Sequence, residues 1–257
     1  MSAGAWSFAG LAVAVTAGWL ALYRLPWADP RRRQRVRLAV ASRTGLPARY
    51  VFPVLGTVLY LVLGLVAAAA LARLGGVDVL GLLRWRPDGA SVALTALAAI
   101  GASALTAFGM SLVYAAAPRV DVPGAVASVR WVREILVLPR GWRWAVPMVS
   151  AAVEEFYFRG VVLVGMLAAG APAWAAISVA GLVFTAGQVA LTERRLQALV
   201  LAVSSAVLSL VCGLLTVVES SVAPALLIHA SFAGYYTQTS AQRAAAGLGL
   251  SDTRRQG

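Results

Sequence analysis

The chain has 257 residues, of which 60% are hydrophobic and 12% charged, and its net charge is +12 at pH 7. Its mean hydropathy of +0.80 is far above that of a water-soluble domain of this length, so the composition indicates an integral membrane protein. All 22 basic residues are Arg and lie mostly between apolar stretches. In such positions they set membrane topology and meet anionic headgroups, so nucleic-acid binding is not expected.

A membrane-spanning helix needs about 20 mostly apolar residues. The sequence predicts an all-α, polytopic integral membrane helix bundle with about seven such helices. Its motif-bearing core falls in the C-terminal half. The predicted spans lie near residues 5–23, 50–73, 90–117, 145–168, 172–191, 197–217 and 222–240.

The connections between the spans predict the orientation. The connection 24–49 carries eight Arg and one Asp, which places it on the cytoplasmic side, with the N-terminus outside and the C-terminus inside. The amphipathic connections 77–89 and 126–144 are expected to form a short helix or turn and a cytoplasmic helix at the membrane surface. The use of Arg without Lys is typical of GC-rich bacterial coding, so we expect a bacterial cytoplasmic membrane.

The chain is divided into three predicted parts. Residues 1–76 hold the N-terminal spans and the Arg-rich cytoplasmic loop, residues 77–240 form the core membrane domain, and residues 241–257 form a flexible C-terminal tail. No small-residue cleavage site follows the first apolar run, which is therefore expected to be a retained span. The single Cys212 lies in an apolar stretch, which excludes an intrachain disulfide framework.

Three charged residues interrupt the fourth span, within "EEFYFR". Burying one charge at the bilayer centre costs on the order of 3 kcal/mol, so these side chains must face the bundle interior. Glu155 and Arg159 are four residues apart and share one helical face, whereas Glu154 is rotated by about 100° from Glu155. We predict that Arg159 pairs with Glu155 and leaves Glu154 as the chemically available carboxylate. A buried ion pair beside a protonated Glu remains the alternative.

Two further polar residues lie inside later spans. His229, the one histidine of the chain, follows "SSVAPALLI" in the last span, and Gln188 lies near the end of the span 172–191. A lone His in a membrane helix is often only a hydrogen-bonding group between helices. Polar sites on three different membrane helices nevertheless suggest one shared cavity.

These motifs resemble those of the CAAX-protease and bacteriocin-processing family of intramembrane endopeptidases, often labelled metalloproteases. That family is marked by Glu-Glu-x-x-x-Arg, by Phe-x-x-x-His on the next helix, and by His-x-x-x-Asn or Asp on a later one. Here "EEFYFRG" matches the first motif in full, and "FTAGQ" and "HASFA" match the other two in part. The resemblance extends over about residues 77–240.

What the resemblance implies is glutamate-driven peptide hydrolysis inside the membrane. It implies that Glu154 is the general base that activates a water molecule. It implies that His229 donates to the oxyanion that develops on the scissile carbonyl. Glu155 and Arg159 are then the supporting pair. The implied partners are the lipid bilayer and a membrane-associated peptide or protein substrate.

Two positions depart from the family pattern. Gln188 stands where the family has a His that helps to hold the water, and Ala233 stands where it has a second oxyanion donor. Gln can orient a water but cannot exchange a proton at pH 7, and loss of one oxyanion donor typically costs about a hundredfold in rate. The alternative is therefore a catalytically degenerate protein of this fold that acts as a peptide-binding, immunity or maturation factor. A small proton-coupled transporter ranks last, because the sequence shows no repeat symmetry.

No cofactor and no metal are expected. A zinc site normally takes three or four ligands from His, Cys and carboxylate side chains. The chain has one His, one Cys and no His-Glu-x-x-His motif, so Glu154, Glu155 and His229 would make a poor three-ligand site.

Overall fold

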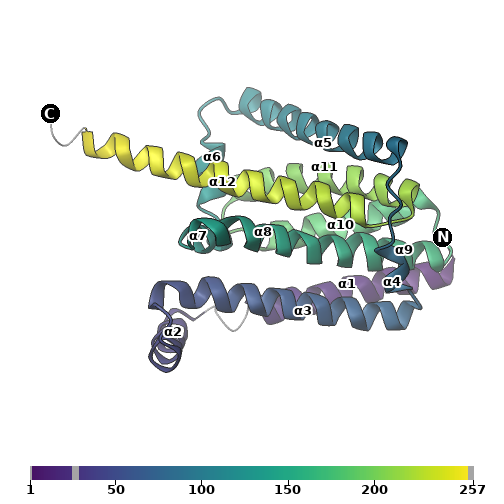
Figure 1. Cartoon of the computed structure of the whole chain (residues 1–257), viewed down its shortest axis with the longest axis horizontal. Coiled ribbons are helices and arrows are strands. Elements are labelled where there is room, and N and C mark those ends of the chain that lie inside the picture. The colour runs from purple at the N-terminus through teal and green to yellow at the C-terminus, as the bar shows by residue number, and fades with distance from the viewer. Residues whose placement is uncertain (1, 25–28, 254–257) are drawn as a thin grey trace.

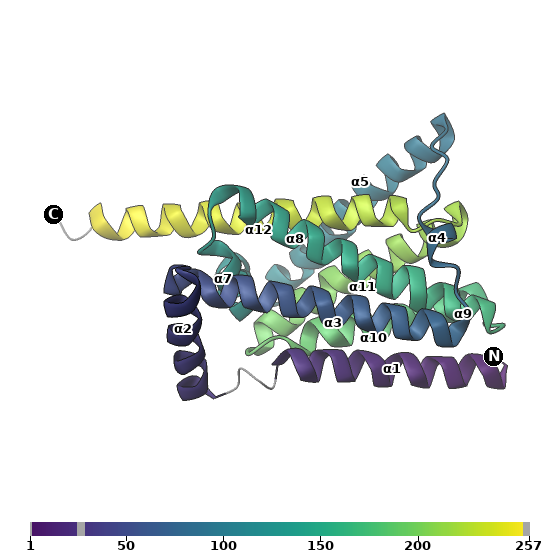
Figure 2. The ribbon, with the colours of Figure 1, turned by 60° about the horizontal axis from the view of Figure 1, so that its bottom comes forward.

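The computed structural model describes residues 2–24 and 29–253. Within these ranges the chain consists of helices and connecting turns, with no strand, which confirms the predicted all-α class. The long helices lie side by side along one axis, except for Gly89–Ala116, which crosses the others at an angle (Figures 1 and 2). They are α1 (Ala3–Arg24), α3 (Val51–Gly75), α5 (Gly89–Ala116), α10 (Ala173–Ala190), α11 (Arg195–Glu219) and α12 (Ala223–Thr253).

Five helices of the described residues are long and apolar enough to cross a membrane, and they coincide with five of the predicted spans. They are α1, the run Ala48–Gly75 that joins the short helix η2 (Ala48–Tyr50) to α3, and α5, α10 and α11.

The other two predicted spans correspond to helices that carry the motif residues. The span 145–168 falls in a composite helix made of α8 (Arg140–Glu155), the π-helical segment η3 (Phe156–Leu163) and α9 (Val164–Ala168). The span 222–240 falls in α12. The first is divided by its π-helical segment and the second carries many polar residues, so the total of seven spans stays a prediction.

The predicted Arg-rich loop 24–49 contains a helix of its own, α2 (Pro30–Thr44). Asp29 caps its first turn by accepting a hydrogen bond from the Arg31 backbone N–H at 2.8 Å. Pro30 occupies the first helical position, and Gly45 ends the helix with φ 69°, a left-handed conformation that favours glycine. Residues 25–28 of the predicted loop lie outside the described residues.

The two predicted surface segments are less regular than expected. The connection 77–89 contains a single turn, α4 (Val79–Leu82). The prediction of one surface helix over 126–144 is wrong. That stretch is divided between the end of α6 (Val122–Ala127), the whole of α7 (Arg130–Leu136) and the start of α8. Pro139 explains the last break, because proline keeps the preceding residue out of the helical conformation.

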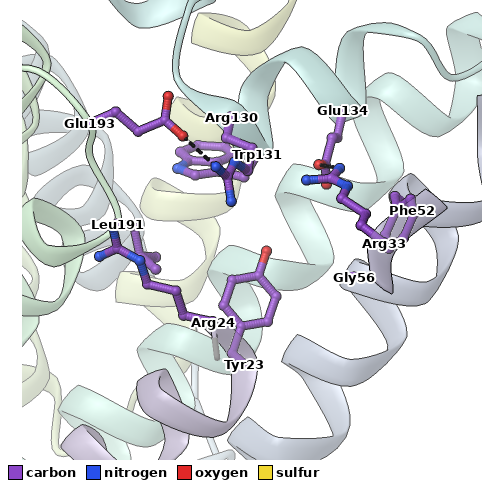
Figure 3. A pocket seen from close by; sticks show the side chains of 10 residues that line it. All are labelled: Tyr23, Arg24, Arg33, Phe52, Gly56, Arg130, Trp131, Glu134, Leu191 and Glu193. Atoms are coloured by element: carbon purple, nitrogen blue, oxygen red, sulfur yellow. Dashed lines mark hydrogen bonds and ion pairs between the residues drawn. The ribbon is translucent and has the colours of Figure 1, made fainter. Parts of the chain in front are cut away.

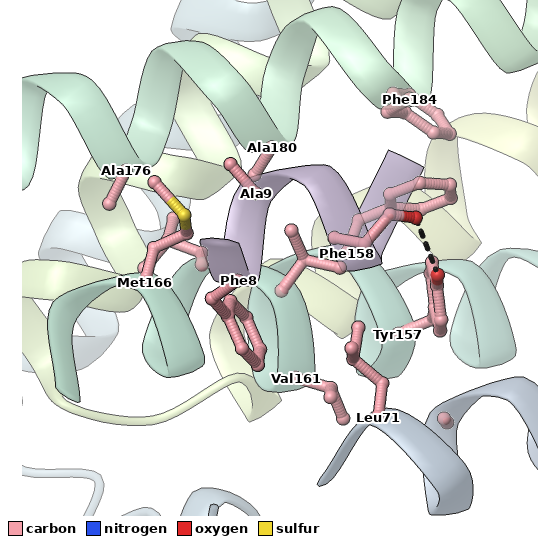
Figure 4. Packing of buried hydrophobic residues seen from close by; sticks show 14 of the residues in the cluster. Phe8, Ala9, Leu71, Tyr157, Phe158, Val161, Met166, Ala176, Ala180 and Phe184 are labelled. Atoms are coloured by element: carbon pink, nitrogen blue, oxygen red, sulfur yellow. Dashed lines mark hydrogen bonds between the residues drawn. The ribbon is translucent and has the colours of Figure 1, made fainter. Parts of the chain in front are cut away.

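The largest hydrophobic cluster joins α1, α3, η3 and α10 (Figure 4). Small residues let the helices approach closely, as is typical of membrane bundles. At Gly165 a Cβ atom would lie 2.2 Å from the Phe8 ring, so no other residue fits there without a shift. Tyr157 is fully buried and its hydroxyl is 2.8 Å from that of Thr16. These contacts fix the position of η3 against α1.

The Arg-rich connections gather at one end of the bundle (Figure 2). We call this the Arg-rich end; it comprises α2, α7 and the turn 191–194 between α10 and α11. Arg33 pairs with Glu134, and Arg130 Nη2 lies 2.9 Å from Glu193 Oε1. These pairs tie the connections to one another.

The C-terminal part of the chain continues α12 as far as Thr253. Residues 254–257, the end of the predicted flexible tail, lie outside the described residues. The flexibility of the tail and the three-part division of the chain stay predictions.

Candidate active site

The charged motif lies where α8 passes into the π-helical segment η3. A π-helical turn holds one more residue than an α-helical turn, and such segments are frequent at functional sites. Seven of the eight residues of η3 are buried, so this segment is surrounded by the bundle. Glu154, Glu155 and Arg159 are 8%, 0% and 1% exposed. They face the bundle interior, as the cost of charges in lipid requires.

Glu155 lies between two cationic or hydrogen-bonding side chains. Its Oε1 is 2.9 Å from Arg159 Nη1, one turn along the same helix. The same oxygen is 2.7 Å from His229 Nδ1 on α12. The pairing expected from the i,i+4 spacing is therefore present. Arg159 also donates to Ser209 Oγ at 3.3 Å, and its guanidinium lies 4.6 Å from the centre of the Phe184 ring.

The bond to Glu155 decides how the imidazole of His229 is oriented. When Glu155 is ionised it only accepts hydrogen bonds, and His229 Nδ1 is then the donor. The other ring nitrogen, Nε2, then faces Glu154, with 3.9 Å between Nε2 and Glu154 Oε2. The Phe184 ring packs against the imidazole edge to face, at 5.6 Å between ring centres. The histidine therefore bridges the two carboxylates.

Glu154 has a different set of partners. Its Oε1 accepts a hydrogen bond of 2.6 Å from the hydroxyl of Tyr60 on α3, and Gln188 on α10 lines the same cavity as Glu154. The ring of Tyr60 is 4.9 Å from that of Trp19, whose Nε1 donates to the Tyr60 carbonyl at 3.2 Å. Sequence reasoning missed Tyr60. The available signal was a tyrosine in the middle of an otherwise apolar span.

A cavity of about 570 Å³ lies beside these residues. Its wall includes Glu154, His229, Gln188 and Ala233, so four of the positions that sequence reasoning singled out share one space. Ala233 contributes only a methyl group to the wall. Glu155 and Arg159 do not line this cavity. They lie on the side of His229 that faces away from it.

The cavity extends toward the Arg-rich end, where Trp131 and Glu134 belong to its wall. A smaller pocket of about 60 Å³ adjoins it there. Figure 3 shows the ion pairs of this pocket, Arg130 with Glu193 and Arg33 with Glu134. The cavity thus connects the buried carboxylates with the charged end of the bundle.

Cys212 lies apart from this cavity wall. Its sulfur is buried and contacts the carbonyl of Ala225 at 3.7 Å. Among the described residues, no three His, Cys, Asp or Glu side chains are grouped so that they could hold a metal ion. The sequence expectation of no cofactor stays a prediction.

Residues 138–234 match the family described as type II CAAX prenyl endopeptidase, Rce1-like. No curated protein and no solved structure matches the chain. The matched segment runs from the turn before α8 into α12 and contains the five residues that the sequence singled out. Tyr60 lies outside it.

Proposed function

We propose that this chain, whose residues 138–234 match the family described as type II CAAX prenyl endopeptidase, Rce1-like, is an intramembrane endopeptidase. Its substrate is a membrane-associated peptide or protein, and the attacking group is a water molecule activated by Glu154. The observation that carries this proposal is the pair formed by Glu154 Oε2 and His229 Nε2. These atoms lie 3.9 Å apart on the wall of one cavity, too far for a direct hydrogen bond and close enough for both to contact one reacting group.

In the proposed reaction, the Glu154 carboxylate takes a proton from the water as the water oxygen attacks the scissile carbonyl carbon. The carbonyl electrons move onto its oxygen, and the N–H at His229 Nε2 donates to that oxyanion. The proton on Glu154 then passes to the amide nitrogen. The carbon–nitrogen bond breaks, which releases an amine and a carboxylic acid. Every group in this sequence belongs to the chain, to the substrate or to the attacking water.

The charge balance of the site supports this assignment. Glu154 and Glu155 carry two negative charges when ionised, and Arg159 carries one positive charge. A protonated His229 makes the sum zero, and a buried site tolerates a neutral group of charges much better than a net charge. When the ring is protonated, Nδ1 donates to Glu155 and Nε2 carries the N–H that donates to the oxyanion.

The remaining residues have positioning roles in this proposal. Glu155 and Arg159 hold the imidazole at a fixed angle, with Phe184 packed on its edge. Tyr60 fixes one oxygen of Glu154, so that the other oxygen is directed at the water. Gln188 contributes an amide that orients the water and exchanges no proton.

The test is cleavage of a membrane-anchored peptide by the full chain in liposomes. Glu154→Gln keeps the shape and hydrogen-bonding capacity of the side chain but removes the base, and we expect at least a hundredfold loss of rate. Glu193→Gln is the matched control, because Glu193 lies at the Arg-rich end and does not line the large cavity. Equal cleavage by the Glu154→Gln variant and the unmodified chain would exclude this mechanism.

A second candidate function is peptide binding without hydrolysis, as in an immunity or maturation factor. It is favoured by two residues of the cavity wall. Gln188 adds no titratable group there, and Ala233 adds no second donor for the oxyanion. The variant that combines Gln188→His with Ala233→Asn separates the two functions. Cleavage by the unmodified chain supports the first. Cleavage only by the double variant, from a zero baseline, supports the second.

We also propose the orientation of the chain in a bacterial cytoplasmic membrane. The Arg-rich end faces the cytoplasm, in agreement with the preference of short Arg-rich connections for that side. The N-terminus is then outside and the C-terminal end of α12 inside. Since the cavity extends toward the Arg-rich end, the substrate reaches Glu154 from the cytoplasmic side.

A further inference from the structure

Thr106 on α5 has a hydroxyl without a hydrogen-bond partner among the described residues. The residue is 2% exposed, so bulk water does not replace the missing partner. Threonines inside helices ordinarily donate to the carbonyl oxygen one turn earlier. Five other threonines of the chain's long helices do so, at 2.7 or 2.8 Å: Thr16, Thr57, Thr95, Thr216 and Thr237.

Thr106 belongs to the wall of the large cavity that also holds Glu154 and His229, and its hydroxyl oxygen is itself buried within that wall. A buried hydroxyl without a partner destabilises a folded protein, and an apolar side chain of the same shape avoids this loss. Valine has that shape. The presence of threonine at an otherwise apolar position of the wall therefore points to a ligand that supplies the missing partner.

Ser205 on α11 is a second buried hydroxyl residue of the cavity wall. It is 4% exposed and lines the same cavity. Its neighbour Ser204 donates to the Val200 carbonyl at 3.0 Å, whereas Ser205 makes no such bond within the part of the chain that the structure describes. The side chain is thus available to a ligand from the cavity side.

The helix register places the two hydroxyls at one level of the cavity. Ala102, Leu208 and Ile228 belong to one hydrophobic cluster, and α11 packs against both α5 and α12. In Figure 1, α5 and α12 run toward the Arg-rich end and α11 runs back. One helical turn from that cluster in this direction lie Thr106 on α5 and Ser205 on α11. On α12 the wall residue one turn from Ile228 is Phe232, which has no polar side-chain atom.

We propose that Thr106 and Ser205 form a hydroxyl pair that binds the backbone of the substrate peptide beside the scissile bond. This inference rests on the proposed function for the identity of the ligand as a peptide. A hydroxyl both donates and accepts, so it pairs with a peptide N–H or C=O without selecting a side chain. One helical turn advances about 5.4 Å, whereas an extended peptide advances about 3.3 Å per residue. Because His229 directly follows Ile228 of that cluster, the pair contacts the peptide about one or two residues from the bond beside His229.

The test measures binding separately from cleavage. A fluorescent, C-terminally farnesylated hexapeptide is titrated against the full chain in liposomes, in a Glu154→Gln background that prevents turnover. Thr106→Val removes the hydroxyl and keeps the shape, and we expect about tenfold weaker binding, the equivalent of ~1.4 kcal/mol. Thr106→Ser restores the hydroxyl and should bind like the parent. In the active background, Thr106→Val should raise KM more than it lowers kcat.

Thermal unfolding separates a binding role from a structural one. Thr216→Val is the matched control, because Thr216 is equally buried, donates to the Cys212 carbonyl at 2.8 Å and does not line the cavity. We expect Thr106→Val to leave Tm unchanged or raised, and Thr216→Val to lower Tm without changing peptide binding. Equal binding by the Thr106→Val variant and its parent, or no binding by the parent, would overturn the inference. Binding without cleavage by the unmodified chain would instead contradict the proposed hydrolysis alone.

Discussion

The two groups of ion pairs in this molecule use the same residue types in different surroundings. At the Arg-rich end, Arg130 pairs with Glu193, and their side chains are 46% and 34% exposed. At the centre, Arg159 pairs with Glu155, and their side chains are 1% and 0% exposed. Exposed pairs contribute only about 0.2–1 kcal/mol because water and salt screen them. Breaking a buried pair leaves an uncompensated charge and costs about 3–5 kcal/mol. The outer pairs thus tie connections together, whereas the inner pair determines the geometry of the site.

The largest effect is expected from Arg159→Met. This change leaves Glu155 buried without its cation, so we expect a loss of about 3–5 kcal/mol of stability, measured by denaturation of the purified protein in detergent. The double variant Arg159→Met, Glu155→Gln removes both charges and should recover most of that loss. If the stability of the single variant lay within about 1 kcal/mol of that of the parent, the buried pair would contribute no more than the exposed pairs.

A smaller effect is expected from Tyr60→Phe, which removes the hydrogen bond to Glu154 Oε1. Hydrogen bonds to charged groups contribute about 1.5–3 kcal/mol, so the peptide-cleavage rate should fall at least tenfold. Tyr23→Phe is the matched control, because Tyr23 packs against Tyr60 at 5.1 Å between ring centres without bonding to Glu154. If both variants lost activity equally, packing rather than the hydroxyl would explain the effect of Tyr60→Phe.

The smallest effect is expected from Arg130→Ala at the Arg-rich end. The partly exposed pair with Glu193 should contribute less than about 1 kcal/mol to stability, and this difference should shrink further when the salt concentration is raised to about 1 M. Parallel denaturation at low and high salt measures both quantities. A loss as large as that of Arg159→Met would remove the distinction between the two groups of pairs.

The sequence predicted the features that depend on local spacing or on composition. The all-α class follows from long apolar stretches, each about the length of a membrane span. The pairing of Glu155 with Arg159 follows from their separation by one helical turn. The gathering of Glu154, Gln188 and His229 around one cavity follows from the cost of polar groups in lipid, which leaves the bundle interior as their only place.

The features that were missed depend on contacts between distant segments or on signals that were passed over. Tyr60 reaches Glu154 across 94 positions of the chain, and a single sequence holds no sign of that contact. The bond between His229 and Glu155 also joins distant segments of the chain, so the sequence alone did not predict it. Helix α2 is different, because the start signal Asp29-Pro30 and the stop signal Gly45 were both present in the sequence.

The π-helical segment η3 has a consequence for insertions and deletions. Because each of its turns holds an additional residue, a deletion of one residue within 156–163 would return the segment to α-helical winding. Everything after the deletion would then keep nearly its present angle about the helix axis, because one residue fewer at α-helical winding turns through almost the same total angle. Gly165 would still face the Phe8 ring, whose atoms leave no room for a Cβ there. A deletion of one residue in the α-helical part before Glu154 could not be absorbed in this way, and it would turn the carboxylates by about 100° relative to the surface that holds them in the bundle.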